Sequence, residues 1–492
     1  MYGEIEINDY HLVKYNLIYD FFQCFSSVEI YGLPLSQCLA AQFEVHIQPF
    51  VDRNRINQDL IKRFRMQSRF QTMGDINQKL LAFENISPVI IKKNKNAILL
   101  SDDYYEFAVD QLKEYEVTLF GVQDKGQNKN LPKQFENYLF RNELLKVNNV
   151  EVKQNQVLIK TQVEKILKSV PHYYFSTPLF QQWLLKVCLN IIKWVYILDQ
   201  LILNTRPSVI IIPSEASIFG AILGMLSKKY NIPFIDMPLY IIGDRTIIPS
   251  RADYYFAWGK NQKNWFFERK IKDDKLTETG NIRFYYEKKS PISSKEAFYQ
   301  KLNIPSNHQI LGFTTQPFLD TNSQIEKWIE LFPENLPVTI LIKKHKGDQY
   351  GYPISGKNKN VKVLPSDYPL YDFLHYINCL MTISSNTAIE AAILDKPLFI
   401  LQPNIPYHYK LNNNKLNAHL AKAQAGEIIE NATDLMKAVT KITTDQSYVD
   451  DLKKKGNKFL SKTLISVEQA PILAKSKIEE IMIKHSLMEG ER

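Results

Sequence analysis

Cysteine is scarce in this sequence. The four cysteines, Cys24, Cys38, Cys188 and Cys379, lie far apart, with no CxxC pair and no Cys/His ligand spacing. Closely spaced cysteines are the usual mark of a disulfide framework or a zinc site, so the sequence predicts neither. No metal site of any kind is predicted, and a reducing compartment is favoured.

Long apolar runs are also lacking. The first residues, MYGEIEINDYH, do not have the basic-then-apolar order of a signal peptide. No uncharged apolar run reaches the roughly 18 residues that a membrane span requires. We therefore expect a cytoplasmic location, or one at the inner face of the membrane. Walker loops, internal repeats and nucleic-acid signatures are absent from the sequence, so no nucleic-acid partner is predicted.

What the chain does have is length and a mildly basic composition. Its 492 residues exceed one usual hydrophobic core, and 45% of them are hydrophobic, so two domains with extensions are expected. The formal net charge is +9, which suits an anionic substrate or a membrane surface.

Residues 381 to 401, MTISSNTAIEAAILDKPLFIL, have the pattern of a strand, a polar turn, a helix and a second strand. Ser384 or Ser385 would cap the helix, whose first N–H groups favour an anion such as phosphate. Glu390 shares a helix side with Asn386 and Thr387, where a carboxylate could accept hydrogen bonds from ribose. The alternative is an ordinary strand–helix–strand unit with a serine cap and a surface glutamate.

A cationic loop follows another predicted strand. Ile310–Phe313 is a predicted strand that ends in Thr314, Thr315 and Gln316, and the next strand ends in LIKKHKGD. Lys343, Lys344 and Lys346 would repel one another there unless an anion lay among them. A solvated basic loop is the alternative.

The first half contains two similar strand–turn–helix patterns. Asp102 and Asp103 follow the predicted strand Ala97–Leu100, at the strand end where doubly wound sheets hold ligands. Glu215 follows the predicted strand Val209–Ile212. We expect Glu215, or else Asp102 or Asp103, to be a general base that takes a proton from an acceptor hydroxyl. Helix capping is the alternative for Glu215 and for Asp103.

Residues 130 to 205 are predicted to be mostly helical and are rich in aromatic side chains. Lys186, Lys193 and Asp199 interrupt the most apolar part, so a membrane span is not expected. Two alternatives remain: a helix buried in the core, or a peripheral membrane contact where a lipid-linked acceptor would be found.

Two segments of the second half resemble known families. SSNTAIEAAILDKP resembles the nucleotide-sugar turn of GT-B glycosyltransferases and of the non-hydrolysing sugar-nucleotide epimerases. LIKKHKGD is similar to the KxHP signature of capsule-type transferases, with Lys346 in the place of the proline. The resemblance implies a donor site that comprises Thr315, Gln316, Lys343, His345, Lys346, Ser384, Ser385, Asn386, Thr387 and Glu390.

A third segment resembles bacterial surface-polysaccharide transferases and the glycerophosphotransferases of the teichoic acid type. Ala252-Asp253, Trp258-Gly259 and Thr279-Gly280-Asn281 match the steps that lead into the second domain of those families. Those families often carry His-Gly after the preceding strand, where this chain has Met237–Leu239. A catalytic histidine is therefore not expected at that place.

The sequence thus predicts an α/β protein with two facing Rossmann-like domains, the GT-B fold. The predicted parts are an N-terminal extension (1–94), an acceptor domain (95–287), a linker (288–305), a nucleotide-sugar domain (306–445) and C-terminal helices (446–492). The expected activity is sugar transfer from a nucleotide-sugar substrate to a surface-polysaccharide or lipid-linked acceptor, without a cofactor. A UDP-linked donor is slightly favoured over a CMP-linked one. A sugar-nucleotide 2-epimerase, a CDP-glycerol-type glycerophosphotransferase and a non-catalytic scaffold are the alternatives.

Overall fold

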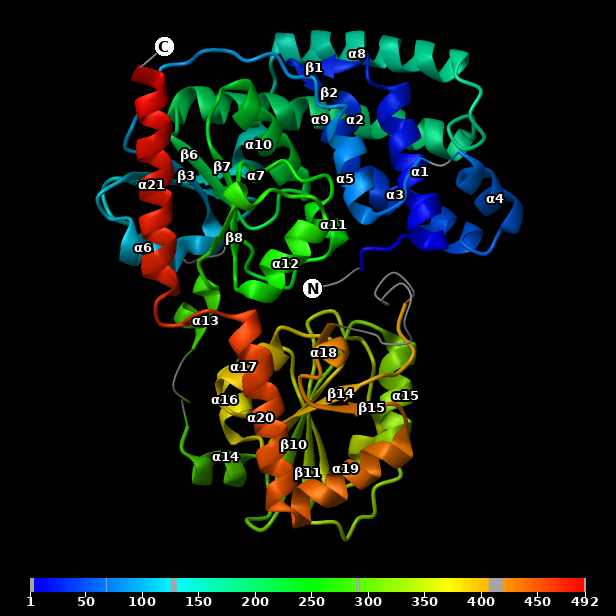
Figure 1. Cartoon of the computed structure of the whole chain (residues 1–492), viewed down its shortest axis with the longest axis vertical. Helices are drawn as coiled ribbons and strands as arrows, with labels where there is room; N and C mark the ends of the chain where they lie inside the picture. Colours follow the sequence, from blue (N-terminus) through cyan, green and yellow to red (C-terminus); the bar gives the residue numbers. More distant parts are fainter. Residues whose placement is uncertain are drawn as a thin grey trace. The chain divides into compact units, whose positions relative to one another are not determined.

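The computed structural model describes residues 4–67, 69–124, 131–288, 291, 293–406 and 419–490. The chain forms two compact units, which are described separately below (Figure 1). The N-terminal unit consists mainly of Ile5–Trp258, Gln262–Ile282 and the last segment, Ser466–Arg492. The C-terminal unit consists mainly of Arg283–Ile465.

The N-terminal unit contains a seven-stranded sheet in the order β5-β4-β3-β6-β7-β8-β9, and all its neighbouring pairs are parallel. The strands are β3 (Ala97–Ser101), β4 (Glu116–Gly121), β5 (Phe135–Leu139), β6 (Val209–Ile212), β7 (Phe234–Asp236), β8 (Tyr254–Ala257) and β9 (Leu276–Glu278). The strand order reverses between β3 and β6, which makes the sheet doubly wound. Its central strands are buried on both faces, as expected for a parallel sheet.

Helices cover this sheet and extend it at both ends of the chain. The longer ones are α1 (Asp9–Cys24), α3 (Ala40–Asn54), α8 (Val150–Ser169), α9 (Pro178–Thr205), α10 (Ile218–Lys229) and α21 (Ala470–Gly490). The shorter ones are α2 (Leu35–Cys38), α4 (Gln58–Met66), α5 (Met73–Leu81), α6 (Tyr105–Gln111), α7 (Phe140–Lys146), α11 (Asp244–Ile247) and α12 (Lys260–Glu268). α21 lies beside α6 (Figure 1), where the Tyr115 hydroxyl donates to Glu479 Oε1 at 3.0 Å.

Among the described helices, α9 is long and apolar enough to cross a membrane by length and composition, and half of its most apolar 18-residue window is buried in the structure. It packs against α8 and α10. Gln156 Nε2 of α8 donates to the Leu189 carbonyl at 2.7 Å, and Asn149 Nδ2 donates to the Tyr196 hydroxyl at 2.8 Å. These contacts agree with the core-helix alternative, since a long core helix passes the same test of length and composition.

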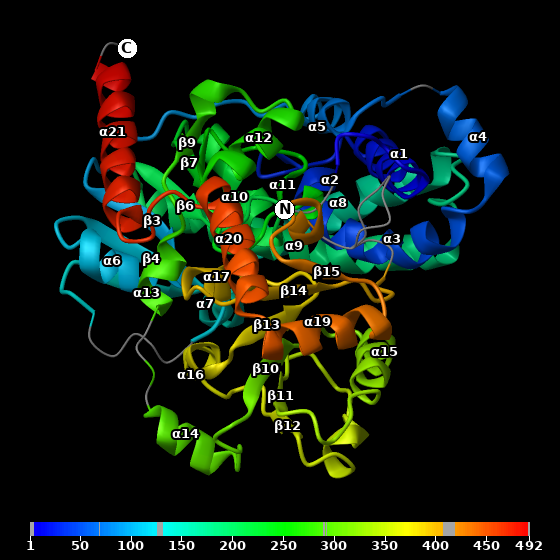
Figure 2. The same cartoon turned by 60° about the horizontal axis from the view of Figure 1, so that its bottom comes forward.

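The C-terminal unit contains a six-stranded parallel sheet in the order β12-β11-β10-β13-β14-β15. Its strands are β10 (Gln309–Thr314), β11 (Val338–Lys343), β12 (Val361–Leu364), β13 (Cys379–Thr382), β14 (Leu398–Leu401) and β15 (Glu427–Ile429). Helices α15 (Leu319–Ile329) and α19 (Ala432–Thr444) lie on one side of it, and α16 (Leu370–Tyr376), α17 (Thr387–Ile393) and α20 (Gln446–Thr463) on the other (Figure 2). Shorter helices are α13 (Ile282–Glu287), α14 (Lys295–Lys301) and α18 (His419–Lys422).

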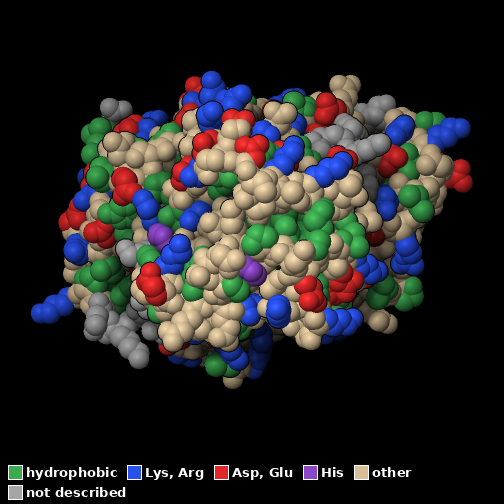
Figure 3. Space-filling model, turned by 90° about the horizontal axis from the view of Figure 1, so that it is seen from below, with side chains coloured by type: hydrophobic (Ala, Val, Ile, Leu, Met, Phe, Trp, Pro, Cys, Tyr) green, Lys and Arg blue, Asp and Glu red, His purple; other side chains and the backbone are tan. Residues whose placement is uncertain are grey.

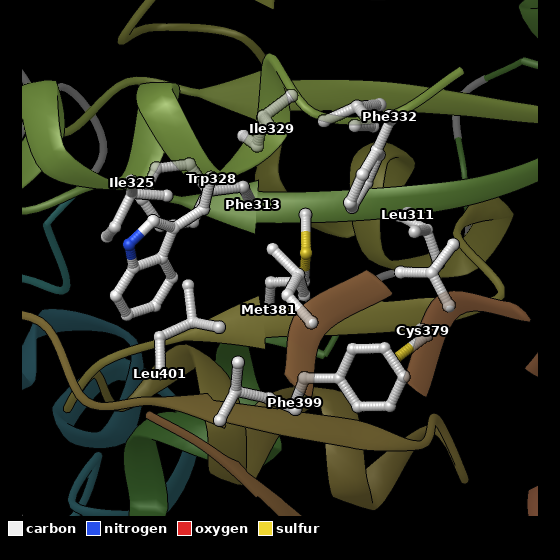
Figure 4. Close-up of a cluster of buried hydrophobic side chains, with 14 of the residues drawn as sticks. Leu311, Phe313, Ile325, Trp328, Ile329, Phe332, Cys379, Met381, Phe399 and Leu401 are labelled. Atoms are coloured by element: carbon white, nitrogen blue, oxygen red, sulfur yellow. The ribbon is translucent and has the colours of Figure 1, made fainter. Parts of the chain in front are cut away.

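The core of the C-terminal unit follows the alternation of its strands. Leu311 and Phe313 of β10 point to one face and meet Met381, Trp328 and other side chains of a single buried cluster (Figure 4). Gly312, the residue between them, lies on the opposite face of the sheet. There α16 approaches so closely that a Cβ atom added to Gly312 would lie 2.5 Å from Phe373 Cζ. Burial of each large apolar side chain contributes about 1.5–3 kcal/mol.

The predicted fold class is confirmed: the chain is α/β, with two doubly wound parallel sheets and a helical N-terminal region. One strand was not predicted. Residues 130 to 205 were expected to be mostly helical, but Phe135–Leu139 forms β5 at the edge of the first sheet.

Acidic and basic side chains are interspersed over the face of the molecule in Figure 3.

Candidate functional site

The strongest candidate site lies at the carboxyl edge of the C-terminal sheet. β10 lies between β11 and β13, and the direction of winding reverses between β10 and β13. The loops after these three parallel strands therefore leave the sheet at the same edge, which is where doubly wound sheets bind ligands. The Thr314 hydroxyl donates to Thr382 Oγ1 at 3.1 Å and joins the ends of β10 and β13.

The loop after β11 is tied to the loop after β10. The backbone N–H of Thr315 donates to the Lys343 carbonyl at 3.2 Å, and the N–H of His345 donates to Thr315 Oγ1 at 2.9 Å. His345 Nδ1 accepts from the N–H of Gly347 at 3.0 Å, so a neutral His345 carries its proton on Nε2. The imidazole itself is exposed. This arrangement leaves Nε2–H free to donate to an incoming phosphate oxygen.

The three lysines of this loop differ in their surroundings. Lys343 is buried and its Nζ donates to the Ser366 carbonyl at 2.7 Å. Burial lowers the pKa of Lys343, and Asp367 opposes that shift. Lys344 Nζ donates to the Tyr350 carbonyl at 2.7 Å, whereas Lys346 is exposed. Main-chain carbonyls thus accept from two of the three lysines, and the presence of an anion among them stays a prediction.

The loop after β13 carries the predicted hydroxyl groups. Ser385 Oγ accepts from the N–H of Thr387 at 3.2 Å and lies 2.9 Å from Thr387 Oγ1. The N-cap residue of α17 is Asn386 rather than either of the predicted serines, although Ser385 does accept from the first N–H of the helix. Ser384 and Asn386 are half-buried in the same turn, as is Gln316 in the loop after β10.

Glu390 lies one turn further along α17 and is 1% exposed. Its Oε1 is 3.4 Å from the guanidinium of Arg283, which also pairs with Glu287 at 2.7 Å. Burial raises the pKa of Glu390 to about 7, and the Arg283 charge opposes this shift. Arg283 was not predicted as a site residue, since no local pattern connects it to a partner 107 residues away.

The predicted bases lie at the corresponding edge of the N-terminal sheet, after β3 and β6. Asp103 is exposed, and Asp102 is buried beside Gly121, where a Cβ atom would lie 2.5 Å from Asp102 Oδ2. Ser101 Oγ donates to Asp103 Oδ2 at 3.0 Å and accepts from the N–H of Asp103. The cap of this turn is therefore Ser101, and the predicted alternative that Asp103 is the cap was wrong.

Glu215 is fully buried, and both of its carboxylate oxygens accept hydrogen bonds. Its Oε2 accepts from the N–H groups of Arg251 and Ala252 at 2.5 Å each, and its Oε1 accepts from the Tyr255 hydroxyl at 2.8 Å. Burial and the neighbouring Asp236 hold the pKa of Glu215 well above its usual range. The N-cap of α10 is Ser217, so Glu215 is not the cap either. These surroundings favour a structural role, because the carboxylate is enclosed and already bonded.

Side chains of two of the motifs quoted above, Trp258 and Asn281, hold the loop after β7. Trp258 Nε1 donates to the Pro238 carbonyl at 2.6 Å, and Asn281 Nδ2 donates to the Leu239 carbonyl at 3.2 Å. Tyr104 also donates a hydrogen bond to the Met237 carbonyl. The loop is thus fixed by three side chains, and its first residue is a buried methionine in place of an imidazole.

A metal site in the described part of the chain would need a cluster of side chains that could bind a metal ion. No group of three or more His, Cys, Asp or Glu side chains within those ranges could hold a metal ion. The groups that converge at the C-terminal sheet are an imidazole, an exposed ammonium and several hydroxyls. This set suits an anion rather than a cation.

Two doubly wound parallel sheets, one with a basic and a hydroxyl-rich loop at its point of reversal, give this chain the two-Rossmann composition of GT-B transferases. Residues 251–463 match the model of the family described as CDP-Glycerol:Poly(glycerophosphate) glycerophosphotransferase. The resemblance to glycerophosphotransferases of the teichoic acid type that the sequence indicated is thereby confirmed for this part of the chain. No curated protein matches the chain.

Solved structures with a similar fold include three transferase or epimerase structures. A variant of the wall teichoic acid polymerase TagF has 12% identity and a TM-score of 0.46, covering 91% of this chain and 99% of its own. UDP-GlcNAc 2-epimerase from Neisseria meningitidis, bound to UDP-GlcNAc, has 12% identity and a TM-score of 0.49, covering 79% and 100%. A glycosyltransferase from Rickettsia africae ESF-5 has 12% identity and a TM-score of 0.49, covering 80% and 99%.

Proposed function

We propose that this chain is a transferase that moves a sugar from a nucleotide-sugar donor to a glycan or lipid-linked acceptor. The observation that carries the proposal is the meeting of three loops at the carboxyl edge of the C-terminal sheet. One loop supplies His345 and the exposed Lys346, and another supplies Ser385 and Thr387. Such groups complement the phosphates of a nucleotide-linked donor.

In this proposal the donor residues act on the leaving group. When the acceptor oxygen bonds to the sugar, the bond from the sugar to the phosphate oxygen breaks and negative charge grows on that oxygen. His345 Nε2–H, Lys346 and the hydroxyls of the Ser384–Thr387 turn would stabilise this charge because they are already oriented. Glu390, held by Arg283, would bind the ribose.

The proton of the acceptor hydroxyl needs a base. Glu215 was the favoured candidate, but it is enclosed and saturated with donors. Of the two alternatives, Asp103 is exposed and Asp102 is buried. Within this proposal we therefore assign the role of base to Asp103, and Asp102 is the second candidate.

The family match favours a second candidate, transfer of glycerol phosphate from CDP-glycerol. Met237 counts against it, since the related families often carry a histidine at this strand end. A sugar-nucleotide 2-epimerase shares the donor turn but acts on the donor alone, without an acceptor. A scaffold with a relic pocket would bind no nucleotide.

A donor screen tests these alternatives. The melting temperature is measured with UDP, CMP, GDP, dTDP, CDP and CDP-glycerol, because a ligand that binds the folded form raises it. We expect the largest rise with UDP. A rise with CDP and CDP-glycerol alone would establish the second candidate, and no rise with any nucleotide would contradict both. Incubation with a UDP-sugar and no acceptor separates the epimerase, which alone converts the donor into its 2-epimer without an acceptor.

A further inference from the structure

A broad groove lies at the amino edge of the N-terminal sheet, at the opposite end of β3 from Asp103. It has a volume of about 1110 Å³ and is lined by the starts of β3, β4 and β5 and by the C-terminal end of α9. Since β3 has five residues, the two edges are separated by roughly 16 Å along the strand. The groove is therefore separate from the carboxyl edge of the same sheet.

The lining of this groove is cationic. Its basic members come from three separate segments: Lys92, Lys93, Lys95, Lys133 and Arg206. Its acidic members are Glu116 and Glu136, and Glu116 already accepts from Asn94 Nδ2 at 2.8 Å. The groove thus has an excess of positive charge.

Four of these five cations form no ion pair with a carboxylate of the described residues. Lys93 donates to the Asn231 carbonyl. Within the described ranges, no carboxylate forms an ion pair with Lys92, Lys95, Lys133 or Arg206. Like charges held around a concave surface repel one another and focus a positive potential into it. An anion that occupies the groove would relieve this repulsion.

The shape and the aromatic lining narrow the class of anion. The groove is open and far larger than a single phosphate requires, and Tyr138 is half-buried in its wall. Tyrosine faces pack well against sugar rings, because such rings present apolar C–H groups beside their hydroxyls. Separate cations along a groove match a chain whose repeat units each carry a negative charge.

We propose that this groove binds a linear acidic glycan, with a phosphate or carboxylate on its repeat units. This inference rests on the proposed function, since such a polymer is an acceptor or product that a surface-polysaccharide transferase would extend. The groove holds the polymer away from the reacting end. Binding at this edge would keep a growing chain on the enzyme between transfers.

Binding of labelled oligomers to the full chain tests the proposal. The probes are an oligogalacturonate, which carries carboxylates, and a short polyphosphate, which carries phosphates; neutral dextran and a single-stranded oligodeoxynucleotide are the comparisons. Fluorescence anisotropy is measured at low and at high salt. We expect at least one acidic probe to bind, dextran not to bind, and the affinity to fall with salt.

The variants are chosen as a matched pair. Lys95→Ala/Lys133→Ala removes two groove cations, and Lys165→Ala/Lys168→Ala removes two exposed lysines of α8 beside the other end of α9. The 28 residues of α9 place these two sites about 40 Å apart along the helix. We expect about fivefold weaker binding for the groove variant, from two screened charge contacts, and no change for the α8 variant.

The outcomes separate this inference from the proposed function. Equal affinities of the two double variants, or preference for the oligonucleotide over both acidic probes, would overturn the groove assignment. We expect the groove variant to keep the nucleotide-induced rise in melting temperature. If no nucleotide binds but the groove behaves as stated, the proposed function fails and the polyanion site stands.

Discussion

At the scale of single residues, Glu390 and Glu287 share one guanidinium but differ in solvent exposure. Arg283 lies 2.7 Å from Glu287 and 3.4 Å from Glu390, whose side chains are 46% and 0% exposed. Burial raises the pKa of Glu390 to about 7, so this carboxyl is partly protonated at neutral pH. A partly protonated carboxyl can both donate to and accept from a ribose hydroxyl.

Glu390→Gln should change how stability depends on pH. In the folded chain Glu390 keeps its proton up to about pH 7, whereas in the unfolded chain it releases it near its usual pKa of 4.5. Its contribution to stability is therefore full below pH 4.5 and is lost as the pH rises through 7, by up to about 3 kcal/mol. We expect the variant and the wild type to be similar at pH 4.5, and the variant to be relatively more stable at pH 8, in denaturant titrations.

Glu287→Gln is the matched control. It removes the other carboxylate from the same arginine, at a position close to half exposed. An exposed ion pair contributes at most about 1 kcal/mol, so this variant should keep the pH dependence of the wild type. A flat difference between Glu390→Gln and the wild type across pH 4.5–8 would show that burial does not govern this carboxyl.

Residue roles were predicted only where the signal was local. The hydroxyl of Ser385 at the start of α17 and the position of Glu390 on that helix follow from spacing within ten residues. The carbonyl partners of Lys343 and the enclosure of Glu215 by the 251–252 segment depend on tertiary contacts. The pairing of Arg283 with Glu390 could not be predicted either, because the two residues lie in distant segments of the chain.

At the scale of strands and helices, the prediction succeeded where burial is continuous. β6 (VIII) and β14 (LFIL) are apolar throughout; both strands were predicted, and β6 with its observed bounds. β5 (FENYL) was missed because only Phe135 in it is buried, as is common at the edge of a sheet. A short edge strand lacks the apolar run that identifies a central one.

Gly312→Ala should destabilise the sheet that carries the candidate donor site. The added Cβ would lie 2.5 Å from Phe373 Cζ and 2.8 Å from Ile377 Cγ2, so α16 must move or the rings must shift. Overpacking of this kind costs about 1–3 kcal/mol. Thermal or denaturant unfolding of the purified variant measures the effect.

Gly351→Ala controls for the change of residue type. No described heavy atom lies within 4 Å of the position of its Cβ. The expected change in the free energy of unfolding is within about 0.5 kcal/mol. If the two variants were equally stable, the close approach of α16 to β10 would not be the reason that position 312 needs a glycine.

At the scale of the whole molecule, the two C-terminal helices belong to different units. α20 packs on α17 in the C-terminal unit, whereas α21 packs on α6 in the N-terminal unit. α21 buries Ala474, Ile478 and Ile481, and its Glu479 accepts from the Tyr115 hydroxyl. The N-terminal unit is therefore completed by the last segment of the chain.

Deletion of residues 466–492 should act on one unit only. Loss of the buried isoleucines alone removes about 3–6 kcal/mol from the N-terminal unit. By differential scanning calorimetry we expect one transition to move to lower temperature and a second, from the C-terminal unit, to remain in place. A single transition that moves as a whole would contradict independent unfolding of the two units.

The most direct test of the account is nucleotide binding to a pair of histidine variants of the C-terminal sheet. His345 follows β11 at the carboxyl edge, whereas His308 precedes β10 at the amino edge and lies 3.0 Å from Thr339 Oγ1. Isothermal titration calorimetry with UDP should show about tenfold weaker binding for His345→Ala, from loss of one hydrogen bond to phosphate, and unchanged binding for His308→Ala. Equal affinities for the wild type and His345→Ala would contradict a nucleotide site at the carboxyl edge of this sheet.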